Sequence, residues 1–494
     1  ARYRRNGIAH LLAISGLHTG FLGLALYRLL RKKCGLRLSG AVTALFLCLY
    51  AALTGGDTGV LRSSLMLGLG FLALCLGRSY DLRSAASFAL LFLLFCSPLQ
   101  LFQCGFQLSF LAVFSIGGPG KALTERFAAK RNLCAAFLQS LTVFLVTLPV
   151  ISYWFFSLPP YGILLNLLVI PMTGALLLLG FVLLAAAFAA PPLALLCGQI
   201  LHLALGAQIL LCRLAACLPF HRILLGRPRG WQLAVYSVCL ALGFRLLLGR
   251  DSRPKEKRQR ELRRVLLLCA ALGAGLSLLP IRSRVPRVWV LDIGQGDAIV
   301  IEQGSRCITI DGGSTSRPDC GKQVIEPFLE SRALGTVNTA FLTHADLDHT
   351  NGLSYLASRG SGIPVKRVIL NPAAETDAHY AKLMAALREN PETELCFMGA
   401  GDVYGNFHCL WPSREALPEE VNEQSLILLF TANGKRCLFT GDAGQPSEEK
   451  LLEWLAAPEQ AAERAALTDI DLLKVGHHGS RGASSEAFLE LLSP

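Results

Sequence analysis

Acidic residues are scarce in the first 285 residues of this 494-residue chain. That stretch holds 6 Asp and Glu against 30 Lys and Arg, whereas residues 286–494 hold 29 acidic residues against 17 basic ones. The formal charges of the two parts are therefore +24 and −12, which give the net charge of +12. Hydrophobic residues make up 52% of the chain and charged residues only 17%, which excludes an ordinary soluble protein. The contrast predicts a membrane domain, residues 1–284, followed by a water-soluble domain, residues 285–494.

Closely spaced cysteine pairs are also missing. The chain has 16 Cys, but no two of them form a Cys-x-x-Cys pair, and the second half holds the odd number of five. This pattern argues against disulfides and against a zinc ribbon, and it favours buried side chains that act as small hydrophobes. The five cysteines are Cys307, Cys320, Cys396, Cys409 and Cys437.

Long apolar segments fill the first half and predict a polytopic α-helical membrane domain. Crossing a bilayer takes about 20 apolar residues, and we expect about eight to ten such helices. Phe106–Ile116 is too short to cross alone and is expected to be a re-entrant or buried helix. The first apolar run has no cleavage site of a signal peptide. The predicted spans are Ile8–Leu30, Gly40–Leu53, Leu61–Leu76, Ala85–Leu101, Leu133–Phe155 and further segments from Ile163 onward.

Two basic segments predict which ends of the helices face the cytoplasm. Arg28–Arg37 holds five Lys and Arg, and Arg245–Arg264 holds nine against three acids. Both are expected in the cytoplasm, because Lys and Arg resist translocation. Val265–Pro280 then has two interpretations. If it crosses the membrane, the acidic domain lies outside the cytoplasm; if it lies on the surface, that domain is cytoplasmic.

The second half alternates short strands with helices, which indicates an α/β domain with a core of its own. Helical patterns occur at His379–Arg388 and Ser447–Leu455. The predicted strands are Val288–Ile293, Ala298–Glu302, Cys307–Ile310, Thr339–Leu342, Arg367–Leu370, Ser425–Phe430, Arg436–Phe439 and Ile470–Val475.

Possible metal ligands follow four of these strands. The densest group is Thr343-His344-Ala345-Asp346-Leu347-Asp348-His349, which places two imidazoles and two carboxylates in six residues. Like charges at such spacing repel unless a cation lies between them, so the run predicts a metal site. Asp311-Gly312-Gly313, Thr440-Gly441-Asp442 and Gly476-His477-His478-Gly479-Ser480 follow other strands. For Asp311 a tight turn is favoured over a direct catalytic role, and both interpretations stay open.

This order of residues resembles the metallo-β-lactamase fold, whose signature is His-x-His-x-Asp-His followed by a bridging Asp and a last His. The resemblance implies an αββα domain with two divalent metal ions, Mn²⁺ or Zn²⁺. His344 and Asp346 would belong to the first metal position, Asp348 and His349 to the second, Asp442 would bridge them, and His478 would be the final ligand. Asp348 and His477 would be the catalytic residues, with His477 contacting the substrate.

Two departures from that signature affect the first metal position. Asp346 replaces the second His, which makes the site harder and favours Mn²⁺ or Mg²⁺ beside Zn²⁺. A third imidazole has no clear counterpart, and His408 is only a weak candidate that is better explained as a residue at a strand end. The first position is therefore expected to be incomplete, or to be filled only together with substrate.

Polar residues inside the apolar half are candidates for a transport path. His10, Ser15 and His18 occur in one apolar segment, Arg62 lies beside a second, and Gln107 lies within a third. Polar groups at membrane depth face a bundle interior or a water-filled path, because contact with lipid costs free energy. Helix packing alone is an equally good explanation for each.

Together these segments resemble the ComEC family of DNA-internalisation competence proteins. The resemblance rests on His10-Leu11-Leu12-Ala13-Ile14-Ser15-Gly16-Leu17-His18, on Gly105–Phe114, and in the second half on Val290–Asp297, Asn422–Leu426 and the His-His-Gly-Ser run. It implies a multi-pass protein of the cell membrane that takes up single-stranded DNA during natural transformation. Its partners would be DNA, the membrane and other competence proteins, with a homo-oligomer possible. Because the family usually has further residues at both ends, and the chain opens without Met, we expect a fragment that is truncated at the C-terminus.

The resemblance further implies that the second half is a metal-dependent nuclease, a phosphodiesterase that degrades the non-transported strand. Two other functions stay open. The second half is alternatively a catalytically inactive gating domain on a DNA channel, or the chain is a membrane-tethered metallohydrolase of a non-nucleic phosphodiester. The acidic balance of −12 means that DNA bound there would be held by metal ions or by local Lys and Arg.

Overall fold

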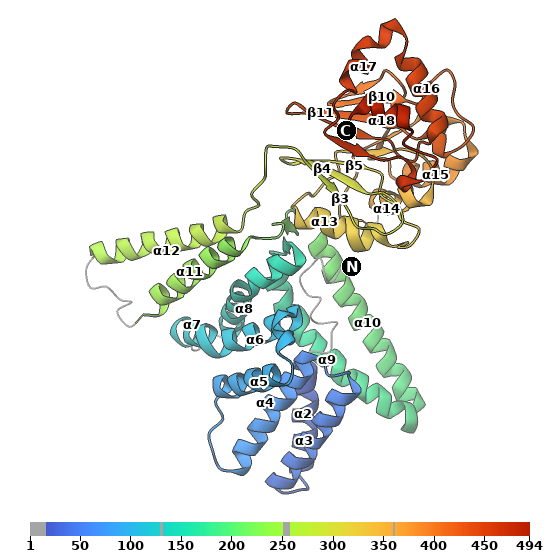
Figure 1. Cartoon of the computed structure of the whole chain (residues 1–494). Helices are drawn as coiled ribbons and strands as arrows, with labels where there is room; N and C mark the ends of the chain where they lie inside the picture. The colour runs from blue at the N-terminus through green and yellow to red at the C-terminus, as the bar shows by residue number, and fades with distance from the viewer. Residues whose placement is uncertain (1–15, 129–131, 250–256, 359–360) are drawn as a thin grey trace. The chain divides into compact units, whose positions relative to one another are not determined.

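The computed structural model describes residues 16–128, 132–249, 257–358 and 361–494, and the chain divides into two compact units (Figure 1). The first unit comprises Ala1–Leu279 and the second Pro280–Pro494. The change of composition that the sequence places after residue 284 therefore lies a few residues beyond the division between the units. Each unit is described by itself below.

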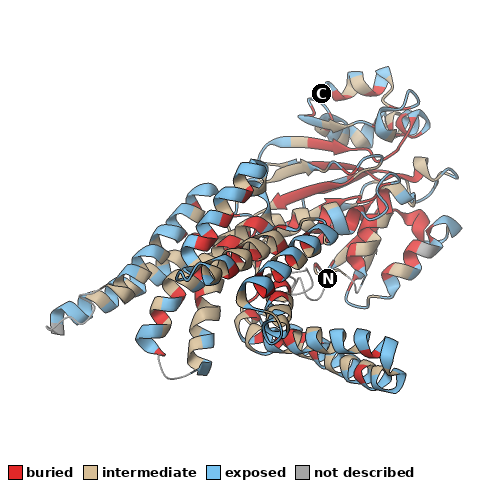
Figure 2. Cartoon of the chain, turned by 90° about the horizontal axis from the view of Figure 1, so that it is seen from below, coloured by how far each residue is buried: buried red, intermediate tan, exposed pale blue. Residues whose placement is uncertain are grey.

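The first unit is entirely helical apart from one short strand pair. Six of its described helices are long and apolar enough to cross a membrane, and the shorter α5 (Leu82–Cys96) is also apolar. At most 28% of the residues in each of the six apolar windows are buried, so these helices expose apolar side chains over much of their surface (Figure 2). The six are α3 (Leu36–Leu53), α4 (Thr58–Cys75), α8 (Asn132–Phe155), α9 (Gly162–Ala189), α10 (Pro191–Ala216) and α11 (Gly230–Leu248).

Six candidate spans are fewer than the eight to ten expected from hydropathy. Three described helices fall short of the length or apolarity of a span: α5, α6 (Cys104–Ser115) and α12 (Lys257–Ser277). The predicted span Ile8–Leu30 lies partly outside the described residues, and its described part is α2 (Gly16–Arg31). The expected short helix at Phe106–Ile116 is α6, a buried helix that packs against α4, α5 and α8 through Phe106 and Phe110. After it the chain bends in a π-turn at Ile116–Gly120 and continues as α7 (Lys121–Phe127).

Helices α11 and α12 form an antiparallel hairpin that is joined by hydrogen bonds near both of its ends. At one end Arg263 Nε of α12 donates to the Leu246 carbonyl near the end of α11, at 2.9 Å. At the other end Gln232 Nε2, in the first turn of α11, donates to the carbonyls of Ser277 and Leu279 at 2.7 and 3.0 Å. From Arg263 onward α12 therefore runs antiparallel beside α11, which is a candidate spanning helix.

The second unit contains two facing β-sheets. The first has the strand order β3-β4-β5-β6-β7-β8 and the second β13-β12-β11-β10-β9. In the first sheet, β5 to β8 run parallel, so their carboxyl ends meet at one edge. The strands are β3 (Arg287–Val290), β4 (Ile299–Gln303), β5 (Arg306–Ile310), β6 (Thr339–Leu342), β7 (Arg367–Leu370), β8 (Glu394–Phe397), β9 (Val403–Tyr404), β10 (Phe407–Trp411), β11 (Ile427–Ala432), β12 (Lys435–Phe439) and β13 (Leu472–Lys474).

Helices cover the outer faces of both sheets. Residues of the two inner faces pack together, for example Phe341 of β6 against Phe407 of β10, with ring centroids 4.6 Å apart. The outer face of the first sheet packs on α13 (Glu326–Ser331), α14 (Leu347–Ala357) and α15 (Ala381–Arg388), and that of the second on α16 (Gln445–Leu455) and α18 (Glu486–Leu492). Most of the strand residues are buried between the two helical layers (Figure 2). The predicted αββα class is confirmed.

All eight predicted strands are present, with ends that differ by a few residues, but three others were not predicted. Strands β8, β9 and β10 lie between residues 394 and 411, where charged and glycine residues interrupt the apolar pattern. Four of the five cysteines of this unit, Cys307, Cys320, Cys409 and Cys437, are free and buried as predicted, whereas Cys396 is half-buried. Burial raises the pKa of the Cys307 thiol to about 12, so this thiol acts as a small apolar side chain.

Candidate metal centre

The densest run of predicted ligands begins at the end of a buried parallel strand. Strand β6 ends at Leu342, and the loop that follows leads to α14, for which Asp346 is the N-cap residue. His344 in the loop and His349 in the first turn of α14 are fully buried. The sharp change from strand to helix places both imidazoles beneath the carboxyl edge of the sheet, with ring centroids 4.2 Å apart.

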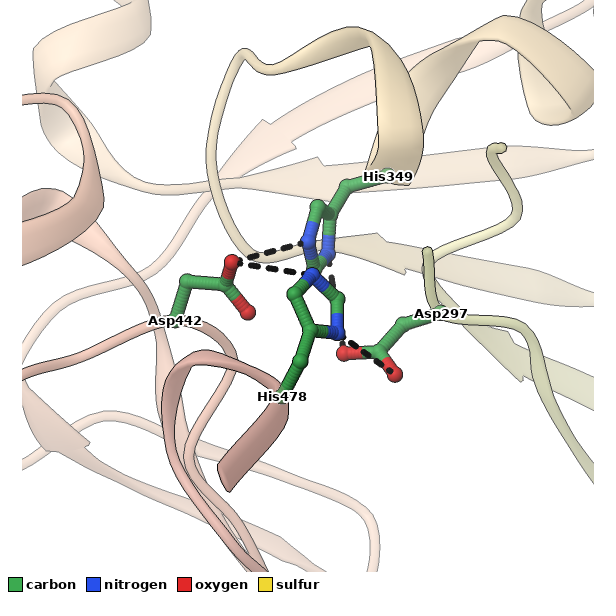
Figure 3. A group of neighbouring side chains, drawn as sticks. All are labelled: Asp297, His349, Asp442 and His478. Atoms are coloured by element: carbon green, nitrogen blue, oxygen red, sulfur yellow. Dashed lines mark ion pairs between the residues drawn. The ribbon is translucent and has the colours of Figure 1, made fainter. Parts of the chain in front are cut away.

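Three residues from different elements converge on one point. Asp442 follows β12 and His478 follows β13, and the Oδ2 atom of Asp442 lies 3.3 Å from His349 Nε2 and 3.2 Å from His478 Nε2. Figure 3 shows both rings turned toward this carboxylate oxygen. Asp348 adds a fourth group, because its Oδ2 lies 3.5 Å from His478 Nε2.

These separations fit the edges of a metal coordination polyhedron. Ligand atoms bound to a tetrahedral Zn²⁺ at about 2.0–2.2 Å are about 3.3–3.5 Å from one another. The Nε2 atom of His349 is buried and has no hydrogen-bond partner among the residues that the structure describes, although a buried polar atom normally has one. The ligand atoms of Asp297, His349, Asp442 and His478 lie within 4.8 Å of one another, so this group could hold a divalent ion. It shares His349, Asp442 and His478 with the predicted second metal position, and Asp348 lies beside it, 3.5 Å from His478.

The rings of His344 and His349 are held by hydrogen bonds at Nδ1, the nitrogen that does not face the centre. His349 Nδ1 lies 2.9 Å from Asp311 Oδ2, and His344 Nδ1 lies 3.0 Å from Thr343 Oγ1 and 3.3 Å from Ser425 Oγ. Metal-bound histidines usually donate a hydrogen bond from the nitrogen that does not bind the metal, which fixes the ring and its tautomer. The arrangement leaves Nε2 of each ring directed at the centre.

Asp311 combines both interpretations that the sequence left open. Its backbone lies in the left-handed region at φ 55°, as in a tight turn. Its carboxylate is buried, accepts hydrogen bonds from Thr343 N and Thr343 Oγ1 at 2.8 Å each, and also contacts His349. Asp311 therefore positions an imidazole without facing the centre itself.

The first metal position has fewer protein groups. His344 Nε2 lies 3.7 Å from Asp346 Oδ2, and it also has no hydrogen-bond partner within the described part of the chain. The weak candidate for a third imidazole, His408, is exposed on β10, where it pairs with Leu429 and Val403. Beside His344 the structure places the Ser425 hydroxyl instead, which also accepts a hydrogen bond from Asp442 N at 3.0 Å. Of the residues predicted for this position, the structure therefore brings His344 and Asp346 together, and the bridging role of Asp442 stays a prediction.

Two charged residues near the centre were not among the predicted site residues. Asp297 lies on the Nδ1 side of both rings, 3.8 Å from His349 Nδ1 and from His478 Nδ1 (Figure 3). Lys474 Nζ lies 2.5 Å from Asp297 Oδ2 and 3.4 Å from Asp442 Oδ1. Because the ring atoms facing Asp442 are Nε2, we interpret Asp297 and Lys474 as groups that surround and hold the ligands. The signal for Asp297 was its glycine-rich approach, Gly294-Gln295-Gly296.

Glycines allow three loops to meet under the centre. A Cβ atom at Gly296, where φ is 138°, would lie 2.2 Å from the Gly313 carbonyl oxygen and 2.5 Å from that of Asp348. A Cβ atom at Gly313 would lie 2.5 Å from the Leu347 carbonyl oxygen. Any side chain at these positions would push apart the loops that carry Asp297, Asp311 and the first turn of α14.

The charged groups of the centre shift one another's pKa values. Burial alone would lower the pKa of His349, but the hydrogen bond to Asp311 and the negative charges of Asp311 and Asp442 raise it to about 10. Burial of Asp442 opposes its ionisation, yet His349 and Lys474 hold the pKa of that carboxyl well below its usual range. Without a metal ion, the protonated imidazole of His349 and the ammonium of Lys474 therefore balance the carboxylates.

The His477–His478 turn has a backbone geometry that few residues adopt. Both residues have positive φ, 42° and 51°, a conformation that is unfavourable for residues other than glycine. The turn directs the His478 ring at Asp442, while the half-buried ring of His477 lies 6.2 Å from that of His478. Its predicted contact with substrate stays a prediction.

The candidates in the membrane half are only partly described. His10 and Ser15 lie outside the described residues, and His18 lies in the first turn of α2. Arg62 of α4 donates from Nε to Ser109 Oγ of α6 at 2.7 Å, and its guanidinium lies 5.9 Å from the centroid of the Phe110 ring. Gln107 of α6 donates to the Leu101 carbonyl at 2.9 Å. The structure thus joins two of the polar segments through Arg62 and α6.

Comparison with known proteins agrees with both units. The family described as "Competence protein" matches residues 1–250, and the metallo-beta-lactamase superfamily matches residues 291–407. The chain belongs to the competence protein family. The resemblance that the sequence motifs indicated is therefore confirmed, and the second unit of this competence protein has a metallo-beta-lactamase domain.

Relatives match along the whole chain. ComE operon protein 3 of Bacillus subtilis is 29% identical over 100% of this chain and 63% of its own length, and competence protein ComA of Neisseria gonorrhoeae is 28% identical over 100% and 65%. Recombination protein 2 of Haemophilus influenzae is 25% identical over 100% and 63%. The chain spans less than two thirds of the length of these relatives. It is nevertheless a multi-pass membrane protein by family and by its six candidate spans.

Proposed function

We propose that this protein takes up DNA in natural transformation. In this proposal the membrane unit transports a single strand across the cytoplasmic membrane, and the metallo-beta-lactamase domain degrades the strand that is not transported. The observation that carries the enzymatic part is the approach of Asp442 Oδ2 to two imidazoles, 3.3 Å from His349 Nε2 and 3.2 Å from His478 Nε2, with Asp348 Oδ2 3.5 Å from His478 Nε2. The name of the Neisseria relative, a competence protein, and the family of residues 1–250 support the transport part.

The residues of the centre have distinct proposed roles. His349, His478, Asp348 and Asp442 would hold one divalent ion, and His344 and Asp346 would hold a second together with Asp442. Such a pair of ions, Mn²⁺ or Zn²⁺, supplies a nucleophile at neutral pH and neutralises charge on a phosphodiester. The side chain of Asp348 is 19% exposed, so it would meet both solvent and substrate and would accept a proton there. His477 would contact the substrate phosphate.

The α11–α12 hairpin supports a location of the metallo-beta-lactamase domain outside the cytoplasm. The sequence between these helices belongs to Arg245–Arg264 with its nine basic residues, which stays in the cytoplasm by the positive-inside rule. Because α12 returns along the length of α11, its last residue lies at the opposite end of the hairpin. A nuclease on that side would meet incoming DNA before it crosses the membrane.

His18, Arg62 and Gln107 are the described residues that we propose for the transport path. The first 285 residues contain six acids, of which the described ones lie at helix ends or in short amphipathic turns: Asp57, Asp81, Glu125 and Glu261. Among the described residues Arg62 therefore has no carboxylate partner, although a charge at membrane depth normally has one. A phosphate of the passing strand would be a suitable counter-charge.

A second candidate function is a DNA channel whose metallo-beta-lactamase domain acts as a gate without catalysis. The observation that favours it is the small number of protein groups at the first metal position, His344 and Asp346. Partners beyond DNA and the membrane, other competence proteins or further copies of the chain, stay predictions.

One experiment separates these functions. The purified full chain would be analysed for bound metal and for cleavage of single- and double-stranded DNA with Mn²⁺ or Zn²⁺, beside Asp348→Ala. His408→Ala is a matched control, since His408 is an exposed histidine of the same domain away from the centre. Metal-dependent cleavage that is lost in Asp348→Ala and kept in His408→Ala supports the nuclease. A metal-loaded chain without activity on DNA contradicts it and favours the gate.

A further inference from the structure

The membrane unit contains arginines at the end of the bundle where basic residues are least expected. No Asp or Glu occurs between Glu125 and Asp251, yet the connection from α10 to α11 holds Arg222, Arg227 and Arg229. This connection leads into the first turn of α11. At the other end of the same helix, Arg245 lies in the last turn of α11 and Arg258 in the first turn of α12.

A small structure, which we call the β1–β2 platform, presents these arginines. It consists of residues 156–161, after α8, and residues 217–229, after α10. Ser157 and Leu158 of β1 (Ser157–Leu158) pair with Leu224 and Ile223 of β2 (Ile223–Leu224). The Phe156 carbonyl accepts hydrogen bonds from the backbone N of Leu225 and of Gly226, at 2.9 and 3.0 Å. The connection after α8 and the connection after α10, which are far apart in sequence, are thereby joined by backbone hydrogen bonds.

Aromatic residues at the end of α8 support the platform. The Arg227 guanidinium lies 4.4 Å from the centroid of the Tyr153 ring, and the side chain of Arg227 is exposed. The neighbouring Trp154 donates from its indole nitrogen to Gln107 Oε1 at 3.2 Å. The end of α8 therefore contacts both the platform, through Tyr153, and α6, the helix that also contacts Arg62.

The position of these charges needs an explanation beyond topology. Lys and Arg at the end of a bundle that crosses the membrane during insertion oppose the positive-inside rule. Arg227 and Arg229 are both exposed, and no ion pair is found for either among the described residues. A planar guanidinium that is held on an aromatic ring is pre-organised for a phosphate group. Exposed arginines beside aromatic rings are also the usual composition of sites for single-stranded nucleic acid.

We propose that the β1–β2 platform binds the phosphate backbone of single-stranded DNA through Arg227 and Arg229. The site lies at the end of α11 opposite the basic connection, which is the outer end in the orientation proposed above. It rests on the proposed function in DNA uptake and names a place where the strand first contacts the membrane unit. Tyr153 holds the Arg227 guanidinium in place.

The test measures binding without cleavage. The full chain is placed in nanodiscs of neutral lipid with EDTA, so that the metal centre cannot act, and binding of a short fluorescent oligothymidylate is followed by anisotropy at several salt concentrations. For single strands the slope of log K against log salt is about −0.7 for each phosphate contact, so Arg227→Gln/Arg229→Gln should flatten it by about 1.4. Arg227→Lys/Arg229→Lys keeps both charges and should keep most of the slope.

Arg245→Gln/Arg258→Gln removes the same charge at the other end of the α11–α12 hairpin and is the matched control. An equal loss in this control, or an unchanged slope in Arg227→Gln/Arg229→Gln, overturns the proposal. Unchanged DNA binding with a loss of co-purified phosphatidylglycerol would assign the platform to lipid headgroups instead, which also overturns it. A wild-type chain that binds no oligothymidylate would contradict transport itself, whereas wild-type binding that the platform variants retain would contradict only the platform.

Discussion

Asp311→Asn should disable both metal positions, because one carboxylate sets the tautomer of two histidines. In the structure Thr343 N donates to Asp311 Oδ1, while Thr343 Oγ1 and His349 Nδ1 both contact Oδ2. A proton on His349 Nδ1 leaves the Nε2 lone pair free for a metal ion. Because the Thr343 hydroxyl donates its hydrogen bond to Asp311, it acts as an acceptor toward His344 Nδ1, at 3.0 Å. His344 then carries its proton on Nδ1, and the lone pair of its Nε2 is also free for a metal ion.

An asparagine reverses this chain of hydrogen bonds. The Thr343 backbone N–H requires an acceptor at the Oδ1 position, so the amide NH₂ group must take the Oδ2 position. There it donates to His349 Nδ1 and to the Thr343 hydroxyl, which then donates to His344 Nδ1. Both Nε2 atoms become protonated. Restoring each ligating tautomer sacrifices a hydrogen bond to a buried group, about 1.5–3 kcal/mol, or roughly a 10- to 150-fold loss of affinity at each position.

Competition with a chromophoric chelator measures this loss as the dissociation constant for Zn²⁺ or Mn²⁺. Asparagine tolerates the left-handed backbone of residue 311, where φ is 55°, so folding should be preserved. Asp471→Asn is the control, because Asp471 also accepts a backbone hydrogen bond, from Arg436 N at 2.9 Å, on the protein surface. Wild-type metal affinity in Asp311→Asn would refute the tautomer argument.

Three further predictions concern the same centre. His478→Ala should abolish the tighter of two metal-binding events, and His344→Ala only the weaker one, because the second metal position has more protein ligands. Isothermal titration with Mn²⁺ measures both events, and two sites of equal affinity in the wild type would contradict this prediction. Lys474→Met should lower the free energy of unfolding of the metal-free chain by about 1–3 kcal/mol, because Asp297 and its neighbours lose their counter-charge. Saturating Mn²⁺ should restore most of this stability. An equal loss with and without metal in thermal-shift assays would argue against this role. The raised pKa of His349, about 10, gives stability that is present below about pH 6.5 and lost as the pH rises through about 10 in the metal-free chain. Metal binding must displace that proton, so the affinity measured by chelator competition should rise up to about tenfold per pH unit between 7 and 9, and a pH-independent affinity would contradict the charged His349.

Composition and spacing were sufficient for the architecture and for most of the ligand types. The scarcity of acids before residue 285 and the apolar segments there predicted the membrane unit, and the alternation after Val288 predicted the α/β domain. The spacing from His344 to His349 marked the centre, because two imidazoles and two carboxylates in one loop have little structural use without a cation. The same run could not show which ring nitrogen faces the centre.

Tertiary structure decided which groups hold these ligands and which only surround them. Asp297, Asp311 and Lys474 come from three separate strand ends, and their contacts with His349 and Asp442 arise only when both sheets are folded. In the membrane unit, hydropathy predicted apolar helices, and the length of Phe106–Ile116 already marked α6 as too short to cross alone. Hydropathy could not pair β1 with β2, since two residues on each side carry no periodic signal.

The sequence by itself determined the order of the two units, the kind of chemistry and the loop in which it is centred, because composition and ligand type are local properties of the chain. Only the folded chain decided that Asp442 Oδ2 faces two Nε2 atoms, that Asp311 governs both histidines, and that Arg227 is held on Tyr153. Those facts depend on distances between residues that are tens to hundreds of positions apart, and the spacing of residues along a chain does not contain them.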